Sequence, residues 1–314
     1  MLAKIISLAL VPFLAVFAVT RTQSSQAPDE PPVAARGPLV VAHRGASGYL
    51  PELTLAAFTL AHAQGADLIE TDVLLTRDGH LVNLHDLTLD RVTNVEEVYP
   101  DRAGPDGKFH AIDFTLAELQ VLRVDGPADR FEGKRVPSGL RISTLDELVE
   151  LVRHLNAQTG REVGLLVEVK NPAFHARRGS PIDAPLLEAL ARHGYDAPGE
   201  NVIIQSFDAA YLRRLREMGT RLPLVWLFDE KEPERIDLAE VARWADGIGP
   251  NRKRLEAAPA LAGEAKRLGM SVFCWTFKNE PAAIERLARD HGLDGVITDF
   301  PDVAREALRA PAAP

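Results

Sequence analysis

Cysteine is almost missing from this chain, because Cys274 is the only one among 314 residues. No intramolecular disulfide can form, and no thiolate cluster can bind zinc. The chain also lacks a basic tract: 45 acidic residues against 36 basic ones give a net charge of −9, which argues against sequence-independent binding to nucleic acid. The apolar and charged fractions, 46% and 26%, are those of an ordinary globular protein and exclude wholesale disorder.

The apolar run at the N-terminus is too short to span a bilayer. It extends from Ile5 to Val19 after the basic Lys4, whereas a membrane helix needs roughly 20 residues. This arrangement predicts a secretory signal peptide over 1–20, with an uncleaved anchor as the alternative. The polar, proline-rich segment 21–38 predicts a disordered linker. We therefore expect an exported protein, periplasmic or secreted, with no stable membrane partner after signal cleavage.

From Leu39 onward, short runs of Val, Ile and Leu alternate with amphipathic helical stretches. Such an alternation predicts a parallel sheet covered on both faces and favours an α/β fold of the (β/α)8 TIM-barrel type. A doubly wound open sheet is the alternative, but GASG at 45–48 lacks the glycine spacing of its phosphate turn. The candidate strands exceed the barrel's eight by one, and the weakest is 246–249. They are 39–42, 68–75, 81–85, 163–169, 202–205, 223–228, 246–249, 271–276 and 295–298.

Several expected helices begin with capping signals. Thr144 and Glu147 have the spacing of a capping box, as do Thr115 and Glu118. Asp208 is placed to cap the helix that follows it. These signals give the alternation of strands and helices an independent support.

One connection is far longer than the usual βα loop of about 2–6 residues. Between His85 and Thr144 the chain is rich in Asp, Gly, Pro and Arg, with one short helical pattern near 115–123. We expect a small insertion subdomain over about 87–141, within a single domain that covers 39–310. In a barrel this insertion would emerge on the face that holds active sites.

Ionisable residues interrupt or end four successive expected strands. Glu70 and Asp72 lie two positions apart in one strand and therefore point to the same side. Burying two carboxylates together is costly unless a cation or a proton compensates. Each residue alone is more often structural, but the repetition at neighbouring strand ends indicates a functional site in the mouth of the barrel. The other members are Glu168 with Lys170, His85 with Asp86, and His43 with Arg44.

These residue types together suit phosphodiester cleavage. Three carboxylates without cysteine are typical of a hard divalent cation bound through oxygen. Two histidines can supply a general base and a general acid near neutral pH. Arg44 and Lys170 bring positive charge for an anionic substrate, and arginine can bind phosphate in a bidentate way. A metal and basic side chains would stabilise the phosphate oxygens while the histidines move protons.

Seven motifs occur in order over roughly residues 39–305: VVAHRGASGYLPELTLAAF, LIETDV, LVNLHD, LLVEVKN, IIQSFD, VFCWTF and DGVITDFPD. This series resembles the glycerophosphodiester phosphodiesterase family, and its first part together with the signal segment is similar to the periplasmic branch. The resemblance implies a barrel related to phosphatidylinositol-specific phospholipases C. It implies hydrolysis of glycerophosphodiesters, such as glycerophosphocholine and glycerophosphoethanolamine, to sn-glycerol 3-phosphate and an alcohol. Family members often have asparagine where this chain has Leu53.

The resemblance also implies roles for individual residues. His43 would accept a proton and His85 would donate one. Arg44 and Lys170 would bind phosphate, and the insertion would lie over the mouth. The metal would be Ca²⁺, as is usual in the periplasmic branch, with Mg²⁺ as the alternative. Its ligands would be Glu70, Asp72 and Glu168.

Three further residues are expected to bind or position the substrate. Trp275 and Phe207, at strand ends, could form an apolar wall beside the glycerol carbons, with a place in the core as the alternative. Glu52, in the loop after the first strand, could orient His43, contact a glycerol hydroxyl or serve only to start a helix. Cys274 lies on the opposite strand face from Trp275 and is expected to be buried.

Other functions stay open on the sequence alone. The same barrel could cleave lysophospholipids or sphingomyelin in a phospholipase D-like reaction, which would require an apolar groove for the acyl chain. A non-catalytic glycerophosphodiester-binding surface protein would need the pocket, but binding alone does not call for an acid–base pair. The sequence also leaves open whether the glycerol 2-hydroxyl or water attacks the phosphorus, which head groups are preferred and what the oligomeric state is.

Overall fold

The described part of the chain begins after the N-terminal apolar run. The expected signal peptide at 1–20 and residues 21–36 of the expected linker lie outside it. Within the described part, no helix is both long enough and apolar enough to cross a membrane. The computed structural model describes residues 37–126, 137–196, 201–231 and 236–309.

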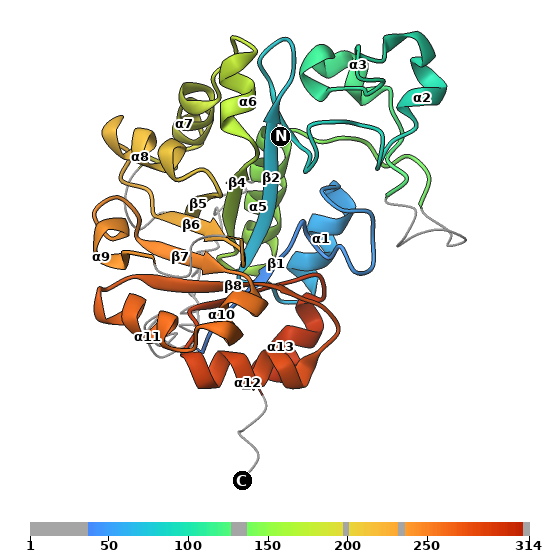
Figure 1. Ribbon diagram of the computed structural model, residues 1–314. Helices are drawn as coiled ribbons and strands as arrows, with labels where there is room; N and C mark the ends of the chain where they lie inside the picture. Colours follow the sequence, from blue (N-terminus) through green and yellow to red (C-terminus); the bar gives the residue numbers. More distant parts are fainter. Residues whose placement is uncertain (1–36, 127–136, 197–200, 232–235, 310–314) are drawn as a thin grey trace, which may run out of the picture. The chain divides into compact units, whose positions relative to one another are not determined.

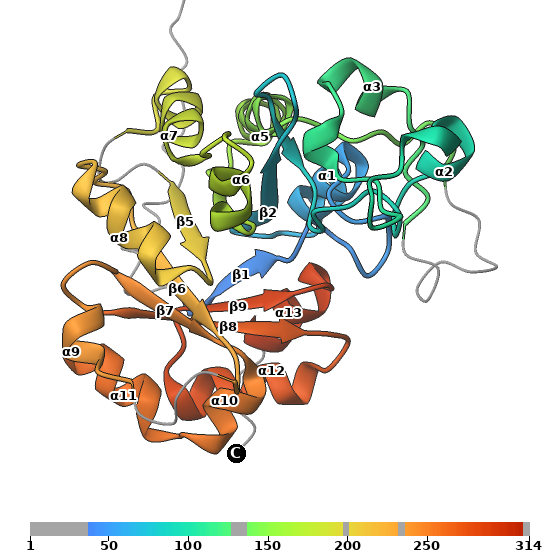
Figure 2. The same cartoon turned by 45° about the horizontal axis from the view of Figure 1, so that its top comes forward.

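Eight parallel strands form a closed barrel, in the order β1-β9-β8-β7-β6-β5-β4-β2, and the pairing of β1 with β2 closes it (Figure 1 and Figure 2). Helices lie outside the strands, so both strand faces are buried and near-continuous apolar runs are favoured. The (β/α)8 prediction is confirmed. The barrel strands are β1 (Leu39–Ala42), β2 (Leu68–Leu75), β4 (Gly164–Val169), β5 (Val202–Ser206), β6 (Leu224–Phe228), β7 (Gly247–Pro250), β8 (Ser271–Phe277) and β9 (Gly295–Thr298).

The helices begin where the capping signals predict. Thr144 accepts a hydrogen bond from the backbone N–H of Glu147, whose side chain bonds back to it, so this capping box is confirmed. The box at Thr115 and the cap at Asp208 are confirmed too. The helices around the barrel are α1 (Leu55–Ala63), α5 (Leu145–Thr159), α6 (Pro172–Arg177), α7 (Asp183–Arg192), α8 (Ala209–Glu217), α9 (Leu238–Val241), α10 (Arg252–Ala257), α11 (Ala260–Arg267), α12 (Pro281–His291) and α13 (Pro301–Arg309).

One expected barrel strand lies outside the barrel, and the prediction was wrong on this point. The candidate 81–85 is β3 (Leu81–Asn83), which pairs antiparallel with the outer part of β2. The weakest candidate, 246–249, corresponds instead to the barrel strand β7. An apolar run does not reveal the direction of a strand, so the surplus strand could not be identified from the sequence.

Alternate residues of each barrel strand point into the barrel or outward under the helices. Val41 belongs to the inward set, whereas its neighbours Val40 and Ala42 pack in the outer layer. The inward apolar residues fill the barrel interior, which is therefore a packed core and not a channel. They are Val41, Leu68, Leu166, Val225, Leu227, Phe273 and Ile297.

The segment between β3 and α5 packs in a second apolar cluster, which also includes Leu74 of β2 and Val82 of β3. It contains α2 (Val95–Val98) and α3 (Leu116–Gln120) and lies beside the outer end of β2 in both views (Figure 1 and Figure 2). Leu89 and Phe114 are among its fully buried members. Residues 127–136, which belong to the expected insertion, lie outside the described range.

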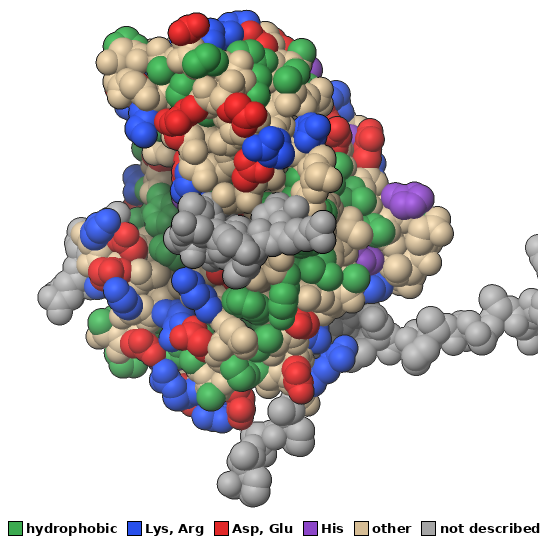
Figure 3. Space-filling view, turned by 90° about the vertical axis from the view of Figure 1, so that its right-hand side faces the viewer, with side chains coloured by type: hydrophobic (Ala, Val, Ile, Leu, Met, Phe, Trp, Pro, Cys, Tyr) green, Lys and Arg blue, Asp and Glu red, His purple; other side chains and the backbone are tan. Residues whose placement is uncertain are grey.

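The surface carries charges of both signs. On the face shown in Figure 3, Lys and Arg side chains are interspersed with Asp and Glu, and no broad patch of one sign forms. A surface of mixed sign creates no strong local field over this face.

We predict that Thr144→Ala destabilises the fold by about 1 kcal/mol, because it removes one half of the capping box at the start of α5. Urea unfolding followed by circular dichroism measures the effect as a lower midpoint. Thr159→Ala, at the other end of the same helix, is the matched control, since its hydroxyl bonds only to the Leu155 carbonyl. Equal midpoints for the two variants would contradict the role of the cap.

Candidate active site

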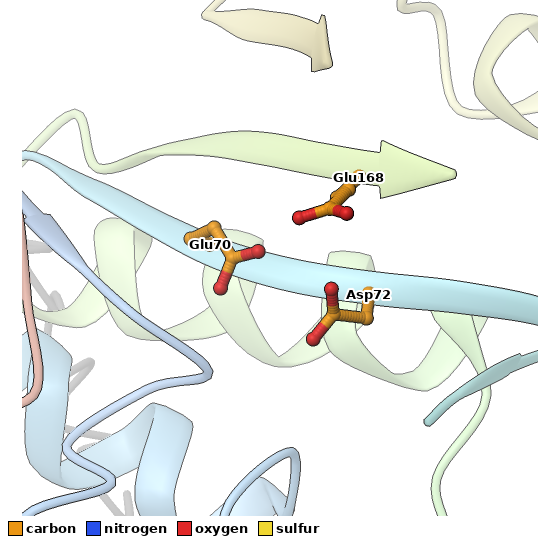
Figure 4. A group of neighbouring side chains, drawn as sticks. All are labelled: Glu70, Asp72 and Glu168. Atoms are coloured by element: carbon orange, nitrogen blue, oxygen red, sulfur yellow. The ribbon is translucent and has the colours of Figure 1, made fainter. Parts of the chain in front are cut away.

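Polar residues continue the inward series of the strands above the apolar core. Glu70 and Asp72 follow Leu68 on the same side of β2, and Glu168 follows Leu166 in β4. The strand register places Asp72 directly beside Glu168. Figure 4 shows the three carboxylates turned toward one another from these two strands.

Burial and mutual repulsion set the charge state of these carboxyls. Burial, together with the nearby Asp72 and Glu168 carboxylates, raises the pKa of Glu70 well above its ordinary value. Burial raises the pKa of Glu168 as well. Burial also acts to raise the pKa of Asp72, but the charges of Lys170 and Arg44 outweigh it and lower this pKa to about 2. The cluster therefore holds more negative charge than its surroundings readily accommodate.

The three carboxylates fit a divalent cation. One oxygen atom of each lies within 4.8 Å of those of the other two. Both oxygens of Asp72 are buried and have no hydrogen-bond partner among the described residues. Leaving a buried carboxylate without hydrogen bonds is costly, and a cation that takes oxygen ligands would offset this cost. Glu70, Asp72 and Glu168 could therefore hold such an ion.

Arg44, just past the end of β1, contacts the cluster through both its backbone and its side chain. Its backbone N–H donates to Glu70 Oε2 at 2.7 Å. Its guanidinium donates to Glu52 Oε1 at 3.0 Å, and its Nε lies 3.3 Å from Asp72 Oδ2. The positive charge of Arg44 is thus fixed against the carboxylates at the mouth of the barrel.

Lys170 supplies the second cation, at the end of β4. Its Nζ donates to Glu168 Oε1 at 2.6 Å and lies 3.7 Å from Asp72 Oδ1. The same ammonium lies 5.5 Å from the ring centre of Phe207, which makes an edge contact with Trp275 at 5.4 Å. The basic and aromatic sides of the site therefore meet at Lys170.

His43 ends β1 and is oriented by a carboxylate from the far end of the sequence. Its Nδ1 lies 2.7 Å from Asp299 Oδ1, directly after β9, and Ser47 donates to the same oxygen at 3.0 Å. Burial and the neighbouring Arg44 lower the pKa of His43 below its ordinary value. The imidazole is therefore neutral at neutral pH, and with Nδ1–H donated to Asp299 its Nε2 is left as the acceptor.

His85 reaches the mouth because β3 runs back along β2. The Leu84 N–H donates to the Asp72 carbonyl at 3.0 Å, which places the next residue at the level of the carboxylates. The Nδ1 of His85 lies 2.5 Å from Asp86 Oδ1. Both histidines thus have a carboxylate at Nδ1. That of His85 comes from the adjacent residue, and that of His43 comes from Asp299, which is distant in sequence but follows the neighbouring strand β9.

Three residues other than glycine have a positive φ among those that the structure describes, and all of them flank the site. Arg44 has φ 56°, Leu53 φ 59° and Asn171 φ 45°. The N–H of Leu53 donates to the carbonyl of Arg44, so two of these residues support each other. Asparagine adopts this conformation far more readily than leucine, which gives a physical reason for the resemblance's observation that family members often have asparagine where this chain has Leu53.

A cavity of about 180 Å³ joins these groups. Of the residues expected from the sequence, Asp72 and Glu52 do not line it: both are buried, and Glu52 bonds to Arg44 and Arg91. Among the described residues, no hydrogen bond joins Glu52 to His43. The expected residues that line the cavity are His43, Arg44, Glu70, His85, Glu168, Lys170, Phe207 and Trp275.

Sequence reasoning missed Asp299, which bonds to His43, and Gln205, which bonds to Glu70. Asp299 follows β9 directly, so an acidic residue at the end of the last strand was the available signal. Gln205, at an inward position of β5, lines the cavity and donates to Glu70 Oε1 at 3.4 Å. Cys274 is fully buried, as expected.

Comparisons with known proteins agree with this geometry. Residues 43–303 match the glycerophosphoryl diester phosphodiesterase family. The glycerophosphodiester phosphodiesterase of Haemophilus influenzae is 34% identical, with 86% of this chain and 90% of that protein covered. That of Treponema pallidum is 31% identical, with 87% and 92% covered. The structure of a phosphodiesterase from Oleispira antarctica in complex with the product sn-glycerol-3-phosphate is 25% identical with a TM-score of 0.69, covering 87% of this chain and 98% of that one.

The closed barrel and the family match together place the protein in the class of phosphoric diester hydrolases. The chain belongs to the glycerophosphoryl diester phosphodiesterase family and is an enzyme of that activity.

We predict that the protein binds one divalent cation per chain and that Asp72→Asn weakens this binding by at least about tenfold, because it removes a ligand charge. Isothermal titration calorimetry with Ca²⁺ and with Mg²⁺ measures the affinities. Asp290→Asn, on the outer helix α12, is the matched control and should bind like the parent. Unchanged binding in Asp72→Asn would contradict the assignment of the site.

Proposed function

We propose that the protein is a metal-dependent hydrolase that converts glycerophosphodiesters, such as glycerophosphocholine and glycerophosphoethanolamine, to sn-glycerol 3-phosphate and an alcohol by histidine acid–base catalysis. The observation that carries the proposal is the presence of two carboxylate-bound imidazoles in one cavity with Arg44 and Lys170. The sn-glycerol-3-phosphate in the Oleispira antarctica structure supports the product.

In this proposal His43 is the general base. Its lowered pKa keeps the imidazole neutral, and its Nδ1–H bond to Asp299 presents Nε2 as the acceptor. Asp299 also stabilises the imidazolium that forms when Nε2 takes a proton. The base can then remove a proton from the attacking hydroxyl as the new P–O bond forms.

His85 is the general acid in the same proposal. It donates Nδ1–H to the carboxylate of Asp86, whose pKa is lowered by hydrogen bonds from His85 and Arg91 against the opposing effect of burial. As the general acid, His85 would pass a proton from Nε2 to the leaving alkoxide when the old P–O bond breaks.

Arg44 and Lys170 bind the phosphate oxygens, and Glu70, Asp72 and Glu168 hold the cation, which we propose to be Ca²⁺ with Mg²⁺ as the alternative. A divalent cation supplies Lewis-acid stabilisation of charge on a phosphoryl oxygen. The two side-chain cations do the same from fixed positions, and they need no rearrangement as charge develops.

Phe207 and Trp275 form the apolar side of the cavity in this proposal, where the glycerol carbons would lie. Their edge contact gives a wall that excludes water from one side of the phosphate.

Two nucleophiles are compatible with the groups present. Attack by the glycerol 2-hydroxyl would give a cyclic phosphate that water then opens, and attack by water would give the product directly.

Lysophospholipid or sphingomyelin cleavage is a second candidate, and one feature of the structure bears on it. A second hollow of about 380 Å³ continues from the site past Lys170 and Phe207, and it includes Leu87 and Phe174. This hollow could accept an apolar substituent.

A non-catalytic binding protein is disfavoured, because the family consists of diester hydrolases and both imidazoles are in place.

We also propose that the enzyme is exported, as the apolar run between Ile5 and Val19 suggests. Glycerophosphodiesters outside the cytoplasm would then be its substrates. The similarity of the motifs to the periplasmic branch supports the same location.

We predict that His43→Ala and His85→Ala each lower kcat for glycerophosphocholine by about 10²–10⁴-fold, the usual contribution of a general acid or base. The release of sn-glycerol 3-phosphate, followed with and without a chelator, measures the effect. His154→Ala, on the exposed side of α5, is the control and should retain full activity.

Full activity of His43→Ala would overturn the proposed acid–base pair, and activity that a chelator leaves unchanged would overturn the metal dependence. Faster cleavage of lysophosphatidylcholine than of glycerophosphocholine would favour the second candidate function.

We predict that Asp299→Asn moves the acid limb of the kcat/KM profile to lower pH and lowers kcat by about 10–100-fold. Asp299 acts to raise the pKa of His43. Its loss lowers that pKa further, so the base stays unprotonated to a lower pH, while its orientation is lost. Asp302→Asn, three residues on and bonded to Tyr49, is the matched control. A limb that stays in place or moves to higher pH would contradict the role of Asp299.

A further inference from the structure

A single arginine of the insertion connects two carboxylates behind the catalytic groups. Arg91 lies in the segment between β3 and α2 and donates from all three of its side-chain nitrogens. Its Nε bonds to Asp86 Oδ2. Its two terminal nitrogens bond to Glu52, at 2.6 Å to Oε1 and 3.3 Å to Oε2. A planar guanidinium is suited to such a fork because its donors are fixed relative to one another.

Each of these two carboxylates also bonds to a residue of the site. Asp86 uses its Oδ1 for His85 Nδ1 while Oδ2 takes Arg91. Glu52 Oε1 accepts from Arg44 as well as from Arg91. An unbroken chain of charge-assisted hydrogen bonds therefore runs from His85 through Arg91 to Arg44.

The backbone of Arg91 is held by the insertion and not by the barrel. The residue lies in a turn between Thr88, which bridges to His110, and Thr93, which bridges to Val124. Leu89 in the same turn is fully buried in the apolar cluster of the insertion. The folding of this cluster therefore decides where the guanidinium of Arg91 lies.

The different exposures of the two carboxylates show what Arg91 restrains. The side chain of Asp86 is 28% exposed, so without Arg91 it could rotate into water and release His85. Glu52 is only 6% exposed and would keep Arg44 as its remaining partner. Glu52 would then attract Arg44 more strongly, because Arg91 would no longer share its charge, and this would draw the Arg44 guanidinium away from the phosphate position.

We propose that Arg91 is a positioning residue through which the insertion completes the active site: its guanidinium fixes Asp86 against His85 and Glu52 against Arg44 at the same time. This inference rests on the roles proposed above for His85 and Arg44. It makes the insertion a necessary part of the catalytic centre, although none of its described residues lines the catalytic cavity.

Arg91→Met tests the proposal in the full-length, metal-loaded protein with glycerophosphocholine as substrate. The variant should lower kcat/KM by about 10–100-fold, with a fall in kcat through His85 and a rise in KM through Arg44. Added guanidinium ion at millimolar concentration should restore part of the activity of Arg91→Met. Arg91→Lys should remain impaired, because an ammonium cannot reach both carboxylates in a fixed plane.

Arg102→Met is the matched control, since Arg102 lies in the same insertion with a similar exposure, 36% against 34%, and pairs with Glu118 away from the site. It should stay within about twofold of the parent and show no response to guanidinium, because its carboxylate partner holds no residue of the cavity. A comparable loss in Arg102→Met, or the same guanidinium response in both variants, would show that Arg91 acts only through the stability of the insertion and would overturn the proposal.

A double-mutant cycle of Arg91→Met with Asp86→Asn completes the test. The proposal expects strong non-additivity, because Arg91 acts on His85 through Asp86. Additive losses of kcat/KM would contradict the proposal. The parent and all variants are assayed at a temperature at which the least stable variant remains folded. His85→Ala in the same assay distinguishes failure of the proposed mechanism from failure of the role of Arg91. An active His85→Ala would refute the proposed mechanism. An inactive His85→Ala beside a fully active Arg91→Met would refute only the role of Arg91.

Discussion

Three carboxylates held inside a closed barrel are the constraint on which the rest of the site depends. They cannot all be ionised in that place without positive charge, which is why burial and repulsion raise the pKa of Glu70 so far. Arg44 and Lys170 leave the ionised cluster with one excess negative charge. A divalent cation would reverse this sign, and one phosphodiester anion would then bring the balance to neutrality.

This local balance explains how an acidic protein can bind an anion. The net charge of −9 belongs to the whole chain and acts at long range, where salt screens it. The cavity contains its own cations within a few ångströms of the place where a phosphate would lie, and there the low dielectric makes each interaction stronger.

The sequence predicted the parts of the structure that depend on local spacing. Glu70 and Asp72 share a side of β2 because side chains alternate along any strand, and the capping box at Thr144 needs only four residues. Most barrel strands lie within one residue of the expected ranges for the same reason. The carboxylates and cations could therefore be assigned to one mouth before the barrel was seen.

What the sequence did not predict depends on pairings between distant segments. The antiparallel direction of β3 follows from the turn after β2, and no apolar pattern records it. Asp299 lies 256 positions from His43, so only the closure of β1 on β9 brings them together. Arg91 lies in a segment without periodicity, and its partners became visible only in three dimensions.

The residues with positive φ beside the mouth of the barrel limit which substitutions this protein can accept there. Holding Arg44 and Leu53 in that conformation costs of order 1–3 kcal/mol each, and the surrounding hydrogen bonds must supply the difference. Selection for thermal tolerance alone would favour glycine or asparagine there, whereas the phosphate-binding role proposed for Arg44 would retain the arginine at that position. The mouth of the barrel is therefore where stability and catalysis make opposite demands on the same backbone.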